Sequence, residues 1–122
     1  MAQPHESWSE LDDEAVRAAL RRLDAALRRR YGDRYARLIL FGSRARGDHS
    51  PDSDADVAVV FRGQLEDRWT TKVEIIAETY QLLLDTGLYV SPWPLSEADL
   101  ADPDRARNPA LVRNVLADGV AP

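Results

Sequence analysis

Residues 38–61 read LILFGSRARGDHSPDSDADVAVVF, and this stretch decides the fold. An apolar run leads into a glycine–serine pair, and a second apolar run follows an Asp-Ala-Asp triplet at positions 54–56. Short apolar runs bounded by glycine or by polar residues are typical of buried strands. The stretch therefore predicts two strands, separated by a tight turn, a short helical piece and a polar loop.

The glycine–serine pair is suited to binding a phosphate group. Gly42 has no Cβ, so the backbone can approach an anion closely at this point. Ser43 offers a hydroxyl at a predicted helix N-terminus, where N–H groups and the helix dipole favour negative charge. Arg44 and Arg46 follow in the turn and can donate charged hydrogen bonds to phosphate oxygens. These four residues predict a phosphate-binding turn.

The acidic triplet is suited to binding a metal ion. Asp54 and Asp56 are two positions apart, and strand residues with that spacing point to the same face. Two adjacent carboxylates repel each other unless a cation lies between them, and Mg²⁺ prefers carboxylate, phosphate and water oxygens. A phosphate-binding turn beside a carboxylate pair indicates metal-dependent phosphoryl or nucleotidyl transfer. The simpler interpretation, two solvated acids that begin a strand, does not explain the turn upstream.

The segment FGSRARGD at residues 41–48, followed by Asp54 and Asp56, resembles the signature of the DNA polymerase β-like nucleotidyltransferase superfamily. It looks most like the minimal nucleotidyltransferase (MNT) branch, whose members are small domains often encoded beside a helical HEPN protein as a toxin–antitoxin pair. The resemblance implies an α/β (α+β) fold, with a small mixed sheet flanked by helices and a core like the polymerase β palm. It implies that Asp54 and Asp56 are catalytic and bind Mg²⁺ in a two-metal arrangement. It also implies that ATP or another NTP is bound by Gly42, Ser43, Arg44 and Arg46.

One position departs from the superfamily pattern. Members that catalyse usually carry a third carboxylate on the next core strand, and here that strand reads LYVSPW at residues 88–93, with no acid. Ser91 is expected at the third position because of its place after the long helix. A hydroxyl is a poor general base at neutral pH and brings no formal charge to Mg²⁺. The resemblance thus supports nucleotide and metal binding better than it supports turnover.

The rest of the chain alternates helices and strands in the order α-β-α-β-α-β-α, which predicts a single α/β domain over residues 1–122. Prolines at 92 and 94 make the third strand short or place it at a sheet edge. The predicted elements are a helix over 10–31 capped by Ser9 and ended by Gly32, a strand over 35–41, a helical turn over 43–48, a strand over 57–61, a helix over 65–85 stopped by Gly87, a strand over 88–93, and helical pieces over 96–100 and 109–116.

The helix predicted over 65–85 is amphipathic. Its apolar residues recur three and four positions apart, which is the helical period. They are Val73, Ile76, Ala77, Tyr80, Leu83 and Leu84. The aromatic residues Trp69, Tyr89 and Trp93 are assigned to the core or to an interface rather than to base stacking. Trp93, which lies between two prolines, is the best candidate for an exposed contact.

Composition excludes several classes of protein. The chain has no cysteine, which excludes disulfides, cysteine-ligated zinc and thiol catalysis. Its longest apolar run, Val57–Phe61, is too short for a bilayer, and its first ten residues do not form a secretory signal, so we expect a cytoplasmic protein. The net charge is −5, yet residues 17–46 hold ten arginines and two acids. Such a basic segment can bind phosphates or an acidic partner, or form a solvated helix face.

Two functions are compatible with the sequence. The first is transfer of a nucleoside monophosphate, AMP, from ATP to a hydroxyl of a partner protein, as the antitoxin of a HEPN/MNT pair. The second is a catalytically impaired nucleotide-binding or toxin-masking module, which the missing third carboxylate favours. Polymerases and aminoglycoside-type enzymes are excluded because 122 residues leave no room for their extra domains, so nucleic acid is not an expected partner. A homodimer stays open, and no membrane contact is expected.

Overall fold

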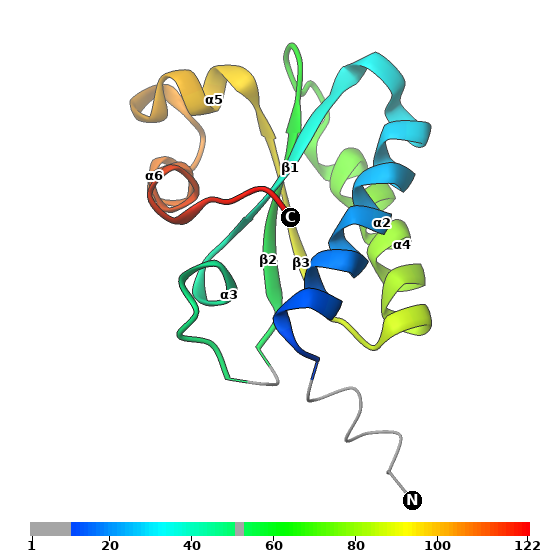
Figure 1. Ribbon diagram of the computed structural model, residues 1–122. Helices are drawn as coiled ribbons and strands as arrows, with labels where there is room; N and C mark the ends of the chain where they lie inside the picture. Colours follow the sequence, from blue (N-terminus) through cyan, green and yellow to red (C-terminus); the bar gives the residue numbers. More distant parts are fainter. Residues whose placement is uncertain (1–10, 51–52) are drawn as a thin grey trace, which may run out of the picture.

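The computed structural model describes residues 11–50 and 53–122, in which a three-stranded sheet lies between two layers of helices (Figure 1). This architecture confirms the small mixed sheet flanked by helices that the sequence predicts. In chain order the elements are α2 (Asp13–Tyr31), the 3₁₀ turn η1 (Gly32–Arg34), β1 (Tyr35–Phe41), α3 (Ser43–Arg46), β2 (Ala55–Phe61), α4 (Arg68–Thr86), β3 (Val90–Ser96), α5 (Glu97–Ala101), the 3₁₀ turn η2 (Pro103–Arg105) and α6 (Pro109–Asp118).

The sheet has the strand order β1-β2-β3, antiparallel between β1 and β2 and parallel between β2 and β3. The central strand β2 is buried from Val57 to Phe61 because it is covered on both faces. The third strand begins and ends later than predicted, since its pairing with β2 continues to Ser96, opposite Phe61. Its position at the edge is as predicted, because prolines lack the N–H that a further strand would need.

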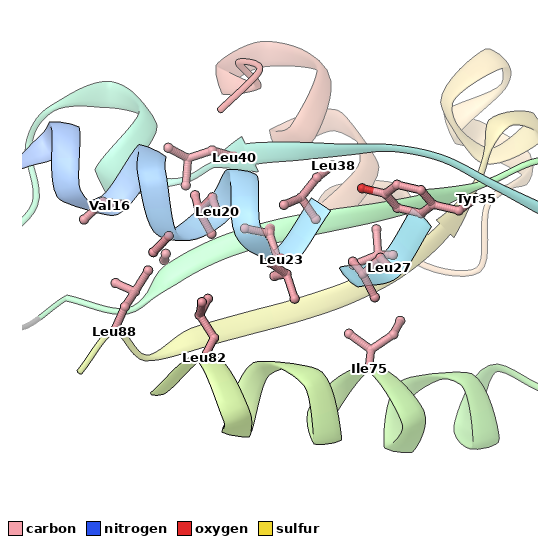
Figure 2. Packing of buried hydrophobic residues seen from close by; sticks show 14 of the residues in the cluster. Val16, Leu20, Leu23, Leu27, Tyr35, Leu38, Leu40, Ile75, Leu82 and Leu88 are labelled. Carbon is pink, nitrogen blue, oxygen red and sulfur yellow. The ribbon is translucent and has the colours of Figure 1, made fainter. Parts of the chain in front are cut away.

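Each face of the sheet has its own helical layer. Helices α2 and α4 cover one face, while α3, α5 and α6 lie against the other (Figure 1). On the first face, apolar side chains of α2 such as Leu20, Leu23 and Leu27 pack onto the strands together with Ile75 and Leu82 of α4 (Figure 2). On the second face, a smaller cluster joins the strands to α6. Its buried members are Phe41, Ala58, Val60, Leu95, Ala106, Val112 and Val115.

Acidic caps fix where the two long helices begin. The Asp12 carboxylate accepts a 2.8 Å hydrogen bond from the Ala15 N–H, so α2 begins at Asp13. The predicted cap, Ser9, lies outside the described residues. Asp67 likewise accepts from the Thr70 N–H at 2.9 Å, and α4 begins three residues later than predicted. Both helices end at the glycines predicted to stop them.

Helix α4 packs on the sheet through a face of two threonines and two aliphatic residues, and most of its large apolar side chains lie on the opposite face. Its buried residues are Thr71, Ile75, Thr79 and Leu82, whereas the apolar positions that predicted the helix lie mostly on its outer face. The two buried threonine hydroxyls donate to carbonyls of their own helix or its cap, so their burial leaves no unpaired donor. The periodicity correctly predicted a helix but not which side of it meets the sheet.

The segment after α6 returns to the sheet and pairs with β1. Leu40 and Val120 exchange two backbone hydrogen bonds of 2.9 and 2.8 Å as an antiparallel bridge. This pairing was not predicted, because a single short bridge leaves no periodic pattern in the sequence. Among residues 11–50 and 53–122, no helix is both long and apolar enough to cross a membrane.

Replacing Leu27 by alanine should test the packing of α2 on the sheet. Leu27 is fully buried, so Leu27→Ala should lower the free energy of unfolding by about 2–5 kcal/mol. Leu116→Ala is the matched control, because Leu116 lies on α6 with its side chain mostly exposed, and it should cost less than about 0.5 kcal/mol. Urea titration measures both values. Equal costs for the two variants would contradict the described core.

Candidate active site

The candidate site lies at the end of the sheet where β1 stops and β2 begins. The antiparallel register sets Phe41 opposite Asp56, and the parallel register sets Ser91 beside Asp56. Residues paired in register on neighbouring strands point to the same face. The Asp56 and Ser91 side chains therefore share the face that α3 and α6 cover, and α3 contacts both β1 and β2 there (Figure 1).

Gly42 lies directly beneath the Asp56 carboxylate. Its φ is +77°, a left-handed conformation that side-chain-bearing residues rarely adopt. A Cβ at this position would lie only 2.7 Å from Asp56 Oδ2. The sequence predicts that this glycine lets the backbone approach a phosphate. In the structure, the group closest to this position is the Asp56 carboxylate. Glycine is therefore needed both for the left-handed backbone and for the space that the carboxylate occupies.

Asp54 and Asp56 lie near each other in different surroundings. Asp54 is exposed just before β2, whereas Asp56 is half-buried within the strand. Burial is the main cause that raises the pKa of the Asp56 carboxyl above its usual value. The negative charge of Asp54 also raises this pKa, whereas the Trp93 side chain and the positive charge of Arg46 lower it. The net result is a raised pKa.

This carboxylate pair fits the chemistry of a hard divalent cation. The raised pKa of Asp56 means that the ionised form is disfavoured in this place, partly by the charge of Asp54. A cation between the two carboxylates would relieve both the burial and the repulsion, and Mg²⁺ binds oxygen ligands of this kind. The donor set therefore agrees with the predicted metal ligands.

The two predicted phosphate-binding arginines have different environments. Arg44 is buried, and its Nε donates a 2.8 Å hydrogen bond to the carbonyl of Ser53, the residue before Asp54. Arg46 is exposed and donates to Asp48 at 3.1 Å and to Asp118 of α6 at 2.9 Å. Arg44 thus holds the start of β2 in place, while Arg46 ties the turn to α6.

Ser43 opens the four-residue helix α3 directly after Gly42. Its carbonyl accepts from the N–H groups of Gly47 and Asp48, which closes the turn. Its hydroxyl makes no hydrogen bond to any described residue and is partly exposed. The Ser43 side chain is therefore available to a ligand, one residue after Gly42.

Ser91, which the sequence analysis expects at the third position of the superfamily pattern, lies beside the acid pair. Ser91 is the register partner of Asp56 on β3, on the same face. Within residues 11–50 and 53–122, no group of three or more histidine, aspartate or glutamate side chains is placed to hold a metal ion. Asp52, another acid of this loop, lies outside the described residues. Asp54, Asp56 and Ser91 thus bring two carboxylates and one hydroxyl to this end of the sheet.

Trp93 belongs to the site, which the sequence did not predict. It lies two residues after Ser91 on the same face of β3, and its indole lies close enough to Asp56 to lower the carboxyl pKa. Its buried Nε1 has no acceptor at full hydrogen-bond geometry among the described residues. The Lys72 ammonium lies over its ring, 4.6 Å from the ring centre. The i+2 spacing from Ser91 was the available signal, but the flanking prolines suggested an exposed side chain instead.

Comparison with known proteins identifies the family of this chain. The family described as "Nucleotidyltransferase domain" matches residues 20–116, which is most of the chain. Two proteins of Methanocaldococcus jannaschii, each named "Putative protein adenylyltransferase", are similar in sequence. One is 32% identical over 101 residues, covering 83% of this chain and 91% of the relative. The other is 38% identical over 60 residues, covering 49% of this chain and 59% of the relative.

The fold is also similar to a solved structure. A "putative nucleotidyltransferase" from Sulfolobus solfataricus superimposes with a TM-score of 0.52 over 98% of this chain and 86% of that one. The sequence identity is 18%, so this likeness concerns the arrangement of helices and strands.

The pKa of the Asp56 carboxyl should respond to its two neighbours in opposite directions. Asp54→Asn removes a negative charge and should lower it, whereas Trp93→Phe removes the indole N–H and should raise it. A pH titration of side-chain carboxyl carbons by NMR measures both shifts. If the pKa of Asp56 is the same in the wild type and in Asp54→Asn, the two carboxylates do not form one site.

Proposed function

This chain belongs to the nucleotidyltransferase domain family, and we propose that it transfers AMP from ATP to a hydroxyl group of a partner protein in the cytoplasm. The observation that carries the proposal is the Asp56 carboxylate, held over Gly42 and within electrostatic reach of Asp54. The relative that covers most of the chain is named for transfer to proteins, which supports a protein acceptor.

Each residue of the site has a proposed role in this transfer. Asp54 and Asp56 hold Mg²⁺, which when bound neutralises charge on the triphosphate and on the reacting phosphate. Ser43 and the first N–H groups of α3 bind phosphate oxygens, and Gly42 lets them come close to the metal ligands. The Arg46 guanidinium, now shared by Asp48 and Asp118, is near enough to Asp56 to turn toward a phosphate.

The proposed reaction is an in-line displacement at the α-phosphorus. The acceptor hydroxyl oxygen forms a bond to this phosphorus, the bond to the bridging oxygen of the β-phosphate breaks, and pyrophosphate leaves with the electron pair. The hydroxyl proton must pass to a base. Because the position next to Asp56 on β3 is a serine and not a carboxylate, the proton passes to solvent water in this chain.

The acceptor is proposed to approach from the side of β3. In-line attack requires the nucleophile opposite the leaving pyrophosphate, which in this proposal lies at the Gly42–Ser43 turn. The opposite side is formed by Ser91 and Trp93, and beyond Trp93 lies a cavity of about 300 Å³. Its walls combine apolar side chains such as Trp69 and Leu111 with the cations of Lys72 and Arg107. These walls fit a protein segment with apolar and acidic residues.

The partner is proposed to be a helical HEPN-type protein, with this chain as its antitoxin. The support is the resemblance of residues 41–56 to the MNT branch, whose members often occur in such pairs. The arginine-rich α2 offers a further binding surface, although several of its arginines already pair with acids of this chain.

A catalytically impaired nucleotide-binding or toxin-masking module is the second candidate function. It is favoured by one observation: the register partner of Asp56 on β3 is Ser91, and the described residues contain no third metal-ligating acid at the site. Losing general-base assistance alone costs about 10²–10⁴-fold in rate. Under this alternative the chain binds Mg²⁺ and ATP and turns over slowly or not at all unless a partner supplies an acid.

Binding of ATP should depend on Mg²⁺ and on both aspartates. Isothermal titration with ATP should give metal-dependent affinity that falls by more than about tenfold in Asp54→Asn/Asp56→Asn, because ligand loss costs at least as much as loss of a supporting residue. Asp102→Asn/Asp104→Asn is the matched control, with the same spacing of acids in the loop between α5 and α6. Metal-independent binding, or equal affinity in both double variants, would contradict the proposed site.

Placing an acid at position 91 should increase transfer. With ATP labelled at the α-phosphate, Mg²⁺ and the product of the adjacent gene as acceptor, Ser91→Asp should label faster than wild type by about 10²-fold or more. Ser91→Asn, which has the same shape without the charge, should not. Wild-type labelling at about 1 s⁻¹, within the ordinary enzyme range, would show that the serine is no defect.

A further inference from the structure

Helix α4 carries a row of large apolar side chains that nothing in the described chain covers. Trp69, Val73, Ile76, Tyr80 and Leu84 are between 45% and 75% exposed, and Ala77 between them is exposed as well. We call these six residues the α4 stripe. They lie on the side of α4 that faces away from the sheet, because the residues that pack inward are Thr71, Ile75, Thr79 and Leu82. A contiguous apolar patch of this kind marks an interaction surface.

The α4 stripe has the same spacing read in either direction. Its members follow one another at intervals of four, three, one, three and four residues. In an antiparallel pair of identical helices with a two-fold axis between Ile76 and Ala77, each member of the stripe meets another member. Trp69 faces Leu84 of the second copy, and Val73 faces Tyr80 of the second copy. Each pair joins a larger to a smaller side chain, as complementary packing requires.

The charges beside the stripe permit two copies to approach. The acids of α4 on the side toward α2 are already bound: Glu74 accepts from the Tyr31 hydroxyl at 2.9 Å, and Glu78 and Asp85 pair with arginines of α2 at 3.2 and 3.0 Å. The residues that border the stripe more closely on that side, Thr70 and Gln81, are uncharged. No like charges among these residues on the α2 side therefore oppose self-association, and on the other side Lys72 would meet the uncharged Gln81 of the second copy.

We propose that the α4 stripe is the interface of a two-fold symmetric homodimer, in which α4 packs antiparallel against α4 of a second copy. Two such faces would bury on the order of 1,000 Å² in total, where specific interfaces begin. The stripe lies in the layer of α2 and α4, and Asp56 lies on the opposite face of the sheet, so the dimer leaves the carboxylate pair open; it covers Trp69, which also lines the cavity beyond Trp93. The inference does not rest on the proposed function.

The mass in solution gives the first test. Sedimentation equilibrium of the full chain at about 10–100 µM should give a species of twice the 13.7 kDa chain mass, dissociating on dilution as a small interface does. Tyr80→Glu should weaken the dimer by at least about thirtyfold, because it buries a charge against Val73. Leu116→Glu, which places the same charge at an exposed leucine of α6, should leave the dimer unchanged.

Mixing two variants tests the register itself. The Val73→Lys chain and the Tyr80→Glu chain should each be monomeric alone. In a dimer of either variant, the two-fold axis would bury the unpaired charge twice, once at each end of the interface. Mixed, they should form a heterodimer, because the introduced lysine of one chain meets the introduced glutamate of the other, while the remaining Val73–Tyr80 pair is native. A wild type that stays monomeric at about 100 µM would overturn the proposal, as would an equal effect of Leu116→Glu. Failure of the two variants to combine would overturn the antiparallel register.

Discussion

The Asp56 carboxylate lies so close to the backbone of Gly42 that only glycine fits there, and this contact joins β1, α3 and β2 at the candidate site. A side chain at position 42 would meet Asp56 Oδ2 at 2.7 Å, and the φ of +77° there already disfavours one. The carboxylate keeps this place because β2 is central and buried on both faces, with β1 and β3 in fixed register on either side. The layer of α2 and α4 thus supports a polar site on the opposite face, at the end of an apolar strand.

Local patterns in the sequence were enough to predict the strands and the turn of the candidate site. The first strand, the glycine–serine turn and the acid pair follow one another within residues 38–61, so their spacing in the sequence was enough to predict their order and their closeness. The place of Ser91 beside Asp56 also followed, because it needed only the order of strands and a position after the long helix. The family match over residues 20–116 agrees with what these residues predicted.

What the sequence did not reveal depends on contacts between distant segments. The burial of Arg44 against Ser53, the pairing of Arg46 with Asp118 and the approach of Trp93 to Asp56 each join residues whose separation carries no periodic signal. The orientation of α4 was hidden for another reason. Helical periodicity identifies an apolar face, but it does not say whether that face meets the protein's own sheet or a second molecule.

We propose that Asp54 and Asp56, together with the Gly42–Ser43 turn, form one site for a metal–nucleotide complex. Diffraction at the manganese absorption edge from crystals grown with Mn²⁺ and a non-hydrolysable ATP analogue tests this directly. The account predicts an anomalous peak between the two carboxylates, with the triphosphate against the N-terminus of α3. A nucleotide bound elsewhere on the chain, or a triphosphate at the turn with no metal between Asp54 and Asp56, would contradict it.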